Sequence, residues 1–422
     1  MTNYNYLYDK SSYEKYININ HLSNDKLLWR EIDNATILPF RTFKNGKIGG
    51  GLLDGNGNYI DGTSLHRGFG GKYDYKKGAV TYSSEEVVFL GLWPDIWGHW
   101  LTDNIRRLWV LKNDEFMSKY GHLKFLYLVY RNHKPCDNAK ELLSIIGGDK
   151  ITIEPIDRVV RYRKVILPDE SFFSEKDSNR FFTKEYVDML DDIRRYGEEH
   201  YNDTGMKKVY FTYRKYTNIR TVGEYRLEGF FKNRGYSIVS PEKFTLKEQL
   251  NILMNCDECA MTAGSVSHNI IFLRDNTKVF IIPRNGSITK YQFALDQIHN
   301  LDITYVDSSL SLYLHPDYPW GGPFYFIISD NLLDCFGVKM NSRNNTRGFA
   351  IYRQLAYMLN GCQKSGEYYK KEYKKYLNVK PSWIENYSVA HKVLQKIKVQ
   401  RVISILLVKY EIICNRRSKK TG

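Results

Sequence analysis

His99, Asp103 and Arg107 follow one another at intervals of four residues in the segment Trp93–Trp109. If this segment is helical, the three side chains lie on one face of the helix. A histidine and a carboxylate at this spacing could act as a general base and its orienting group, beside a guanidinium that stabilises negative charge. Four of the seven tryptophans also lie here, so we expect the segment to be largely buried. The alternative interpretation is an aromatic-rich core helix with a hydrogen-bonded histidine and a structural Asp–Arg pair.

Two arginines follow a predicted strand in the second half of the chain. Arg214 comes directly after the strand at 208–213, Arg220 follows it, and Glu224 lies on the next predicted helix. Arginines between a strand and a helix suit phosphate oxygens, which they bind through charged and often bidentate hydrogen bonds. We therefore expect an anionic group of a ligand at this strand end.

A second candidate anion site is the segment that follows the predicted strand at 258–262. Gly264 opens a predicted helix there, and a helix start presents free backbone N–H groups to an anion. Hydroxyl, imidazole and amide groups that could bind a phosphate, a ribose or a base follow it: Ser265, Ser267, His268 and Asn269. The alternative interpretation is an ordinary turn and helix cap. The chain has neither G-x-G-x-x-G nor G-x-x-x-x-G-K, so dinucleotide and Walker-type sites are not supported.

Alternating strands and helices must position these residues. The apolar runs predict strands at 125–130, 151–153, 164–167, 208–213, 235–239, 258–262 and 278–282. Helices are predicted at 137–147, 176–200 and 222–232, and after the capping box formed by Thr245 and Glu248. Residues 45–75 are rich in Gly and Asn, which indicates tight β-turns. The pattern predicts an α/β protein with two Rossmann-like domains that face a cleft, a turn-rich β region before them and a helical tail after them. Ligands of such sheets bind beyond the carboxyl ends of the strands.

Composition limits the class of protein and of partner. With 422 residues the chain is too long for one core, and 42% hydrophobic and 26% charged residues indicate a folded protein. A net charge of +15 predicts an anionic partner, such as nucleic acid, a membrane surface or a phosphorylated substrate. No helix-turn-helix, zinc-finger or RNP-like motif is present, so we expect no nucleic-acid partner. The pair Cys256 and Cys259 lacks a second ligand pair, so we expect no metal site and place the protein in a reducing cytoplasm.

Two segments near the carboxyl terminus could contact an acceptor or a membrane. The aromatic loop Leu314–Pro323 could stack on sugar rings, or could only pack against its domain. The basic and apolar tail Val389–Lys420 could lie on an anionic membrane surface, or could pack back on the protein. No apolar run is long enough to cross a bilayer, so any membrane association is expected to be peripheral, on the inner face.

Taken in order, the motifs resemble those of glycosyltransferase family 61, and of its bacterial branch. The resemblance covers residues 50–285 and rests on five segments: Gly51–Ser64, Gly98–Trp109, Arg214–Glu224, Pro241–Gln249 and Gly264–Asn269. Two positions depart from the family pattern. Gly223 replaces an asparagine, and Ala263 stands where many eukaryotic members have a histidine.

The resemblance implies a two-domain (GT-B) enzyme that transfers a sugar with inversion, from a nucleoside-diphosphate donor such as a UDP-sugar and without a metal or other cofactor. Asp103 or His99 would be the base, with the choice left open. Arg214 and Arg220 would hold the diphosphate together with Gly264 and Ser265, while Glu248 and Asn269 would contact ribose or sugar.

The resemblance also implies a division of labour along the chain. Residues 1–200 would form the acceptor-side domain, 201–310 the donor domain, and 311–422 the aromatic loop and the tail. The acceptor would be a glycan, lipid-linked or free, in the synthesis of a capsule or another surface polysaccharide. The rival interpretations are a carbohydrate-binding protein without catalysis and a basic nucleic-acid-binding protein.

Overall fold

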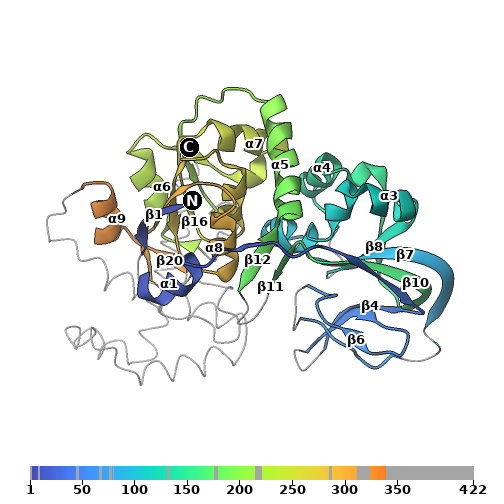
Figure 1. Ribbon diagram of the computed structural model, residues 1–422. Helices are drawn as coiled ribbons and strands as arrows, with labels where there is room; N and C mark the ends of the chain where they lie inside the picture. Colours follow the sequence, from blue (N-terminus) through green and yellow to red (C-terminus); the bar gives the residue numbers. More distant parts are fainter. Residues whose placement is uncertain are drawn as a thin grey trace, which may run out of the picture.

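The computed structural model describes residues 2–7, 10–43, 47–65, 69–75, 78, 80–130, 134–174, 179–213, 221–284, 288–310 and 324–338 (Figure 1). Arg214, Arg220, the loop Leu314–Pro323 and the tail Val389–Lys420 lie outside these residues. Within them, no helix combines the length and the apolar character that crossing a membrane requires.

An eight-stranded mixed sheet occupies the first half of the chain. It contains β3 (Trp29–Asp33), β4 (Thr36–Thr42), β5 (Ile48–Leu53), β6 (Tyr59–Ile60), β7 (Thr81–Trp93), β8 (Lys124–Val129), β9 (Thr152–Ile156) and β10 (Val160–Pro168). The order is β6-β5-β4-β10-β7-β8-β9, with β3 also paired to β10. Strands β7 to β10 pair in parallel, while β3 to β6 pair antiparallel and form the predicted turn-rich region.

A six-stranded sheet, parallel throughout, occupies the second half. It contains β1 (Asn3–Leu7), β13 (Lys208–Phe211), β15 (Ser237–Val239), β16 (Glu258–Thr262), β17 (Lys278–Ile282) and β18 (Asp302–Tyr305), in the order β1-β18-β17-β16-β13-β15. Two small sheets join β2 (Leu22–Ser23), β11 (Phe172–Ser174) and β12 (Arg180–Thr183), and β14 (Thr221–Val222), β19 (Ser309–Leu310) and β20 (Phe324–Phe326). The two large sheets agree with the predicted α/β class.

Helices connect and cover these strands. The α-helices are α1 (Lys10–Ile17), α2 (Trp97–His99), α3 (Asp114–Tyr120), α4 (Asp137–Ile145), α5 (Lys184–Glu199), α6 (Glu224–Lys232), α7 (Leu246–Asn255), α8 (Lys290–Asp296) and α9 (Asp330–Cys335). A π-helix, η2 (Trp100–Asn104), follows α2, and η3 (Leu108–Lys112), η4 (Gly148–Lys150), η6 (Pro241–Lys243) and η7 (Ser265–Phe272) are 3₁₀-helices. The helix predicted from residue 176 begins only at Lys184, because residues 180–183 pair with β11 and β2.

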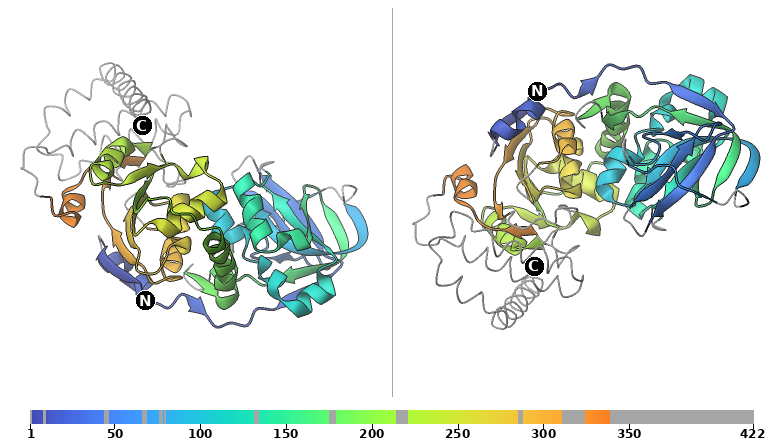
Figure 2. Two further views of the ribbon diagram at one scale, coloured as in Figure 1. Left: turned by 90° about the horizontal axis from the view of Figure 1, so that it is seen from above. Right: turned by 90° about the horizontal axis from the view of Figure 1, so that it is seen from below.

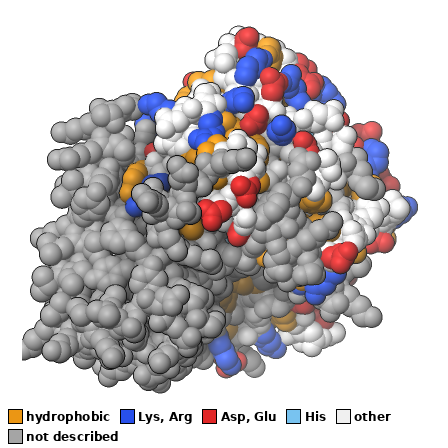
Figure 3. All heavy atoms as spheres, turned by 90° about the vertical axis from the view of Figure 1, so that its left-hand side faces the viewer, with side chains coloured by type: hydrophobic (Ala, Val, Ile, Leu, Met, Phe, Trp, Pro, Cys, Tyr) orange, Lys and Arg blue, Asp and Glu red, His pale blue; other side chains and the backbone are white. Residues whose placement is uncertain are grey.

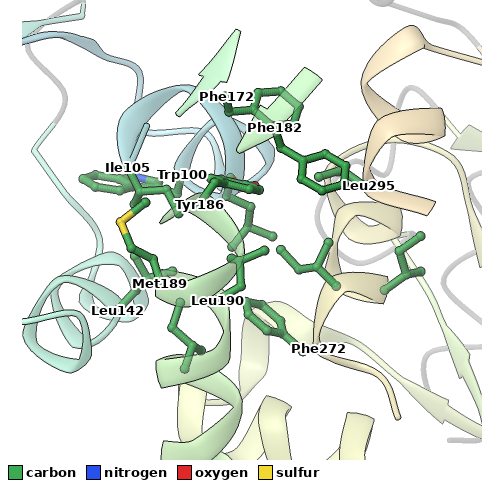
Figure 4. Close-up of a cluster of buried hydrophobic side chains, with 14 of the residues drawn as sticks. Trp100, Ile105, Leu142, Phe172, Phe182, Tyr186, Met189, Leu190, Phe272 and Leu295 are labelled. Carbon is green, nitrogen blue, oxygen red and sulfur yellow. The ribbon is translucent and has the colours of Figure 1, made fainter. Parts of the chain in front are cut away.

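Helix α5 lies between the two large sheets and belongs to a core that includes residues of both (Figure 1). Its buried side chains Tyr186, Met189, Leu190 and Ile193 recur at the spacing of one helix face. Figure 4 shows this face between Trp100 and Ile105 on one side and Phe272 and Leu295 on the other. Each buried side chain of this size contributes roughly 1.5–3 kcal/mol. The shared core therefore fixes how the two halves meet.

The start of the chain joins the second half of the fold. Strand β1 pairs in parallel with β18, and α1 lies beside α8 (Figure 2). The division at residues 200 and 310 stays a prediction. Helix α5 ends at Glu199, but β1 shows that no single cut at residue 200 separates the two large sheets.

A buried carboxylate links β1 to this sheet. Asp296 accepts hydrogen bonds from Tyr4 (3.0 Å), Tyr305 (2.7 Å) and Gln292 (3.2 Å). Burial raises the pKa of Asp296 from 3.8 to about 7, against the effect of these hydrogen bonds. Folding therefore favours the protonated acid. The resulting stabilisation is complete below about pH 4 and is lost as the pH rises through 7.

We therefore expect Asp296→Asn to remove this pH dependence. The free energy of unfolding of the wild type should fall by about 2–4 kcal/mol between pH 4 and pH 8, while the variant should lose much less. Urea titrations at both pH values measure the difference, with the exposed Asp25→Asn as the control. An equal fall in the free energy of unfolding between pH 4 and pH 8 in all three proteins would contradict the assignment.

Candidate active site

The segment after β7 places His99 above a buried Asp103. His99 ends α2, and Asp103 lies on the π-helix η2; such helices are often found at functional sites. The His99 Nδ1 and Asp103 Oδ2 atoms are 2.7 Å apart, and the side chains are 31% and 1% exposed. Because an ionised carboxylate only accepts, His99 donates through Nδ1, and in a neutral imidazole Nε2 is then an acceptor. No described residue hydrogen-bonds to that Nε2 atom.

The surroundings of Asp103 keep its carboxylate ionised. Burial by itself raises the pKa, but the hydrogen bond from His99 and the charges of Arg106 and Arg180 hold the Asp103 pKa well below its usual value. Thr102 Oγ1 also donates to Oδ2 at 3.0 Å, and the Tyr291 hydroxyl donates to Oδ1 at 3.4 Å. The site therefore holds a buried, fully hydrogen-bonded anion beneath an accessible imidazole.

The predicted common face of His99, Asp103 and Arg107 is wrong in its third member. The helix ends at Asn104, a turn follows, and the Arg107 side chain bonds to the carbonyls of Pro168 (3.0 Å) and Gly62 (3.1 Å). Arg106 instead approaches Asp103, with 3.6 Å between Nη1 and Oδ1. The wider π-turn changes the angular spacing of the side chains, so the four-residue rule fails after Asp103.

The predicted segment Gly264–Asn269, in which Gly264 precedes the first residues of η7, packs directly against the segment of His99 and Asp103. Trp97 Nε1 donates to Asn269 Oδ1 at 2.6 Å, and the His268 Nδ1 atom lies 3.3 Å from the Gly98 carbonyl oxygen. A Cβ atom on Gly98 would lie 2.9 Å from the His268 ring, so only glycine allows this approach. Burial lowers the pKa of His268 to about 4, so this imidazole is neutral near pH 7.

The two serines of this loop differ in what they contact. Ser267 Oγ bonds to the backbone of Gly264 and to Gln292 Oε1 at 2.5 Å, so its hydroxyl closes the loop. Ser265 is partly exposed. Gly264 has φ +131°, a value that residues other than glycine rarely adopt.

Two predicted glutamates support local structure. Glu224 is buried and accepts from the backbone N–H of Tyr213 at 2.9 Å, which holds the chain beyond β13. Glu248 Oε2 accepts from Thr245 N at 2.8 Å and completes the capping box that the sequence predicted. Gly223 has φ +85°, and a Cβ atom there would lie 2.3 Å from the Phe326 carbonyl, which explains the glycine at this position.

Sequence reasoning missed Arg284, although its signal was the one used for Arg214. Arg284 follows strand β17, separated from it only by Pro283. Its guanidinium lies 4.4 Å from the centre of the Tyr213 ring, and its Nη2 atom is 3.5 Å from Thr262 Oγ1. It therefore reaches the ends of β13 and β16 as well as its own strand.

The described residues contain no cluster of metal-ligating side chains. Among them, no three His, Cys, Asp or Glu side chains are grouped so that they could hold a metal ion. Cys256 and Cys259 are both buried, and burial raises the pKa of the Cys259 thiol.

Residues 97–280 match the family model described as Glycosyltransferase 61. The match supports a glycosyltransferase of family 61. No curated protein matches the chain. The matched region begins at Trp97 and contains both the His99–Asp103 pair and the segment Gly264–Asn269 that packs against it. The family in turn implies a sugar donor and a glycan acceptor as substrates.

Proposed function

We propose that the protein is an inverting, metal-independent glycosyltransferase in which His99 is the general base and Asp103 orients it. The observation that carries this proposal is the 2.7 Å contact between a partly exposed imidazole and a buried carboxylate. His99 Nε2 takes the proton of an acceptor hydroxyl while that oxygen attacks the anomeric carbon. The bond from this carbon to the donor phosphate breaks, and the nucleoside diphosphate leaves. Of the two candidates for the base, Asp103 is too deeply buried to meet an acceptor.

The donor is proposed to be a nucleoside-diphosphate sugar, such as a UDP-sugar, bound at the carboxyl ends of β13 and β16. The parallel sheet supports this site, because ligands of open α/β sheets bind at that edge. The segment 97–104 follows β7 of the other large sheet and contacts the loop after β16. This juxtaposition supports a GT-B arrangement in which the base meets the donor between two domains.

The biological role is proposed from the resemblance to the bacterial branch of the family. It is the synthesis of a capsule or another surface polysaccharide, on a free or lipid-linked glycan, in the cytoplasm at the inner face of the membrane. The basic tail Val389–Lys420 would provide the contact with that membrane. Figure 3 shows acidic and basic side chains interspersed over the described part of one face, so the positive charge is not gathered into one patch there.

A thermal-shift screen with UDP, GDP, CMP and their sugar conjugates tests the donor site. We expect one nucleotide family to raise the melting temperature of the wild type, and an Arg220→Ala variant to lose that rise. No rise with any nucleotide would reject the proposal and favour one of the rival interpretations. Salt-dependent binding of DNA or RNA, or binding of glycans alone, would then identify which one.

We also propose that Asn269 positions the catalytic segment and does not contact ribose. Its Oδ1 atom is occupied by the Trp97 indole, and its side chain is buried. We expect Trp97→Phe and Asn269→Ala each to lower kcat by about 5–20-fold, with donor KM within twofold of wild type. The double variant should be no worse than either single one, because both remove the same hydrogen bond. A donor KM that rises in Asn269→Ala but not in Trp97→Phe would instead support a contact between Asn269 and ribose.

A further inference from the structure

The order of strands in the six-stranded sheet marks one crevice as a ligand site. The chain runs from β13 to β15 on one side, and then returns to the other side of β13 with β16, β17 and β18. Successive connections therefore run toward opposite edges of the sheet from the point between β13 and β16. In open parallel sheets this switch point opens a crevice at the carboxyl ends of the two strands, where ligands bind.

Arg284 places its guanidinium at this switch point. Tyr213, whose ring it covers, comes two residues after β13, and Thr262 ends β16. A Cβ atom on Gly264 would lie 2.6 Å from the Arg284 Cζ and Nη1 atoms, so the guanidinium occupies the space that this glycine leaves. A second ring, that of Phe324, lies 5.5 Å away. The rings hold the guanidinium over the ends of three strands.

The charge of Arg284 is only partly balanced by the protein. It forms no ion pair with any residue that the structure describes, and its Nε atom is buried without a hydrogen-bond partner. The Tyr213 side chain and Glu224 both act on it electrostatically, but one oxygen of the Glu224 carboxylate accepts from the Tyr213 backbone. Burying a guanidinium without an anionic partner costs free energy. Oxygen atoms of an anionic ligand in the crevice would offset this cost.

We propose that Arg284 binds the diphosphate of the donor and stabilises it as the leaving group. The inference rests on the proposed function, and it adds Arg284 to Arg214 and Arg220 as an arginine that binds the diphosphate. The guanidinium presents a planar pair of donors that suits phosphate oxygens. As the bond between the anomeric carbon and the phosphate breaks, negative charge grows on the leaving oxygen, and a fixed guanidinium favours that change. The stacking on Tyr213 supplies this fixed orientation.

Calorimetric titration of the full chain tests this assignment. The ligands are the nucleoside diphosphate selected by the thermal-shift screen, the corresponding nucleoside and inorganic pyrophosphate. We expect Arg284→Met to lower the affinity for the nucleoside diphosphate and for pyrophosphate by at least about tenfold. The affinity for the nucleoside should change by less than twofold. Arg284→Lys keeps the charge but not the planar fork, so it should fall between wild type and Arg284→Met.

Arg274→Met is the matched control for these variants. Arg274 precedes β17 at the opposite edge of the same sheet, and it pairs with Asp257 at 2.8 Å. Its affinity for all ligands should equal that of the wild type. Equal affinity of wild type and both Arg284 variants for the diphosphate would overturn the inference alone. Absence of binding of every nucleotide to the wild type would overturn the proposed function and the inference together. Melting curves of Arg284→Lys show whether the folded state is retained.

Discussion

Replacing His99 by alanine is expected to lower kcat by about 10²–10⁴-fold while the affinity for donor nucleotide stays within about twofold. The variant removes the accessible Nε2 atom, and the Asp103 carboxylate that remains is too buried to meet an acceptor. Turnover under saturating donor and acceptor measures the loss. His122, an exposed histidine that lies beyond α3, provides the control, because His122→Ala should keep wild-type turnover.

The partner variant Asp103→Asn separates the two roles in the pair. An asparagine keeps the size of the side chain but loses the negative charge that holds the proton on His99 Nδ1. We expect a loss of kcat similar to that of His99→Ala, and little further loss in the double variant, since both residues act as one unit. The Asp103 pKa lies well below its usual value, so Asp103 itself should add no step to the activity profile between pH 5 and pH 9. If both single variants keep wild-type turnover, the segment has only a structural role.

The features that the sequence predicted well are local. The strands at β8, β13, β16 and β17 were visible as apolar runs, and the capping box of Thr245 and Glu248 needs only four consecutive residues. The partnership of His99 and Asp103 was likewise predictable from their spacing. The family match covers residues 97–280, which contain four of the five segments that carry the resemblance, while Gly51–Ser64 lies outside it.

Features that depend on distant residues could not be predicted. The pairing of β1 with β18 joins segments almost 300 residues apart, and no local pattern identifies which strand an apolar run will meet. The π-helix that moves Arg107 away from Asp103 has no reliable sequence signal. The contact of Trp97 with Asn269 spans the two halves of the chain, so no local pattern could predict it. Arg284 had the correct position after a strand, but its stacking on Tyr213 required the fold.

The largest expected effect on stability is that of Glu170→Ala. Glu170 Oε1 lies 3.3 Å from Arg106 Nη2 and 2.8 Å from Arg107 Nη2, and these arginine side chains are 1% and 4% exposed. Removing the carboxylate leaves two buried like charges side by side. Backbone carbonyls still accept from both arginines, and Asp103 Oδ1 still lies 3.6 Å from Arg106 Nη1. We expect the free energy of unfolding to fall by about 3–5 kcal/mol. Urea titration should show a lower midpoint with an unchanged slope.

A surface ion pair provides the control for this prediction. Glu85 pairs with Lys124 at 3.0 Å, but both side chains are about half exposed, at 51% and 45%. Glu85→Ala should therefore cost less than about 1 kcal/mol. Equal small losses in both variants would show that the carbonyl acceptors and Asp103 suffice for Arg106 and Arg107. Because Arg106 also approaches Asp103, a larger loss in Glu170→Ala should be accompanied by reduced turnover per folded molecule. The buried charges that hold the segment in place would then also set the orientation of the catalytic pair.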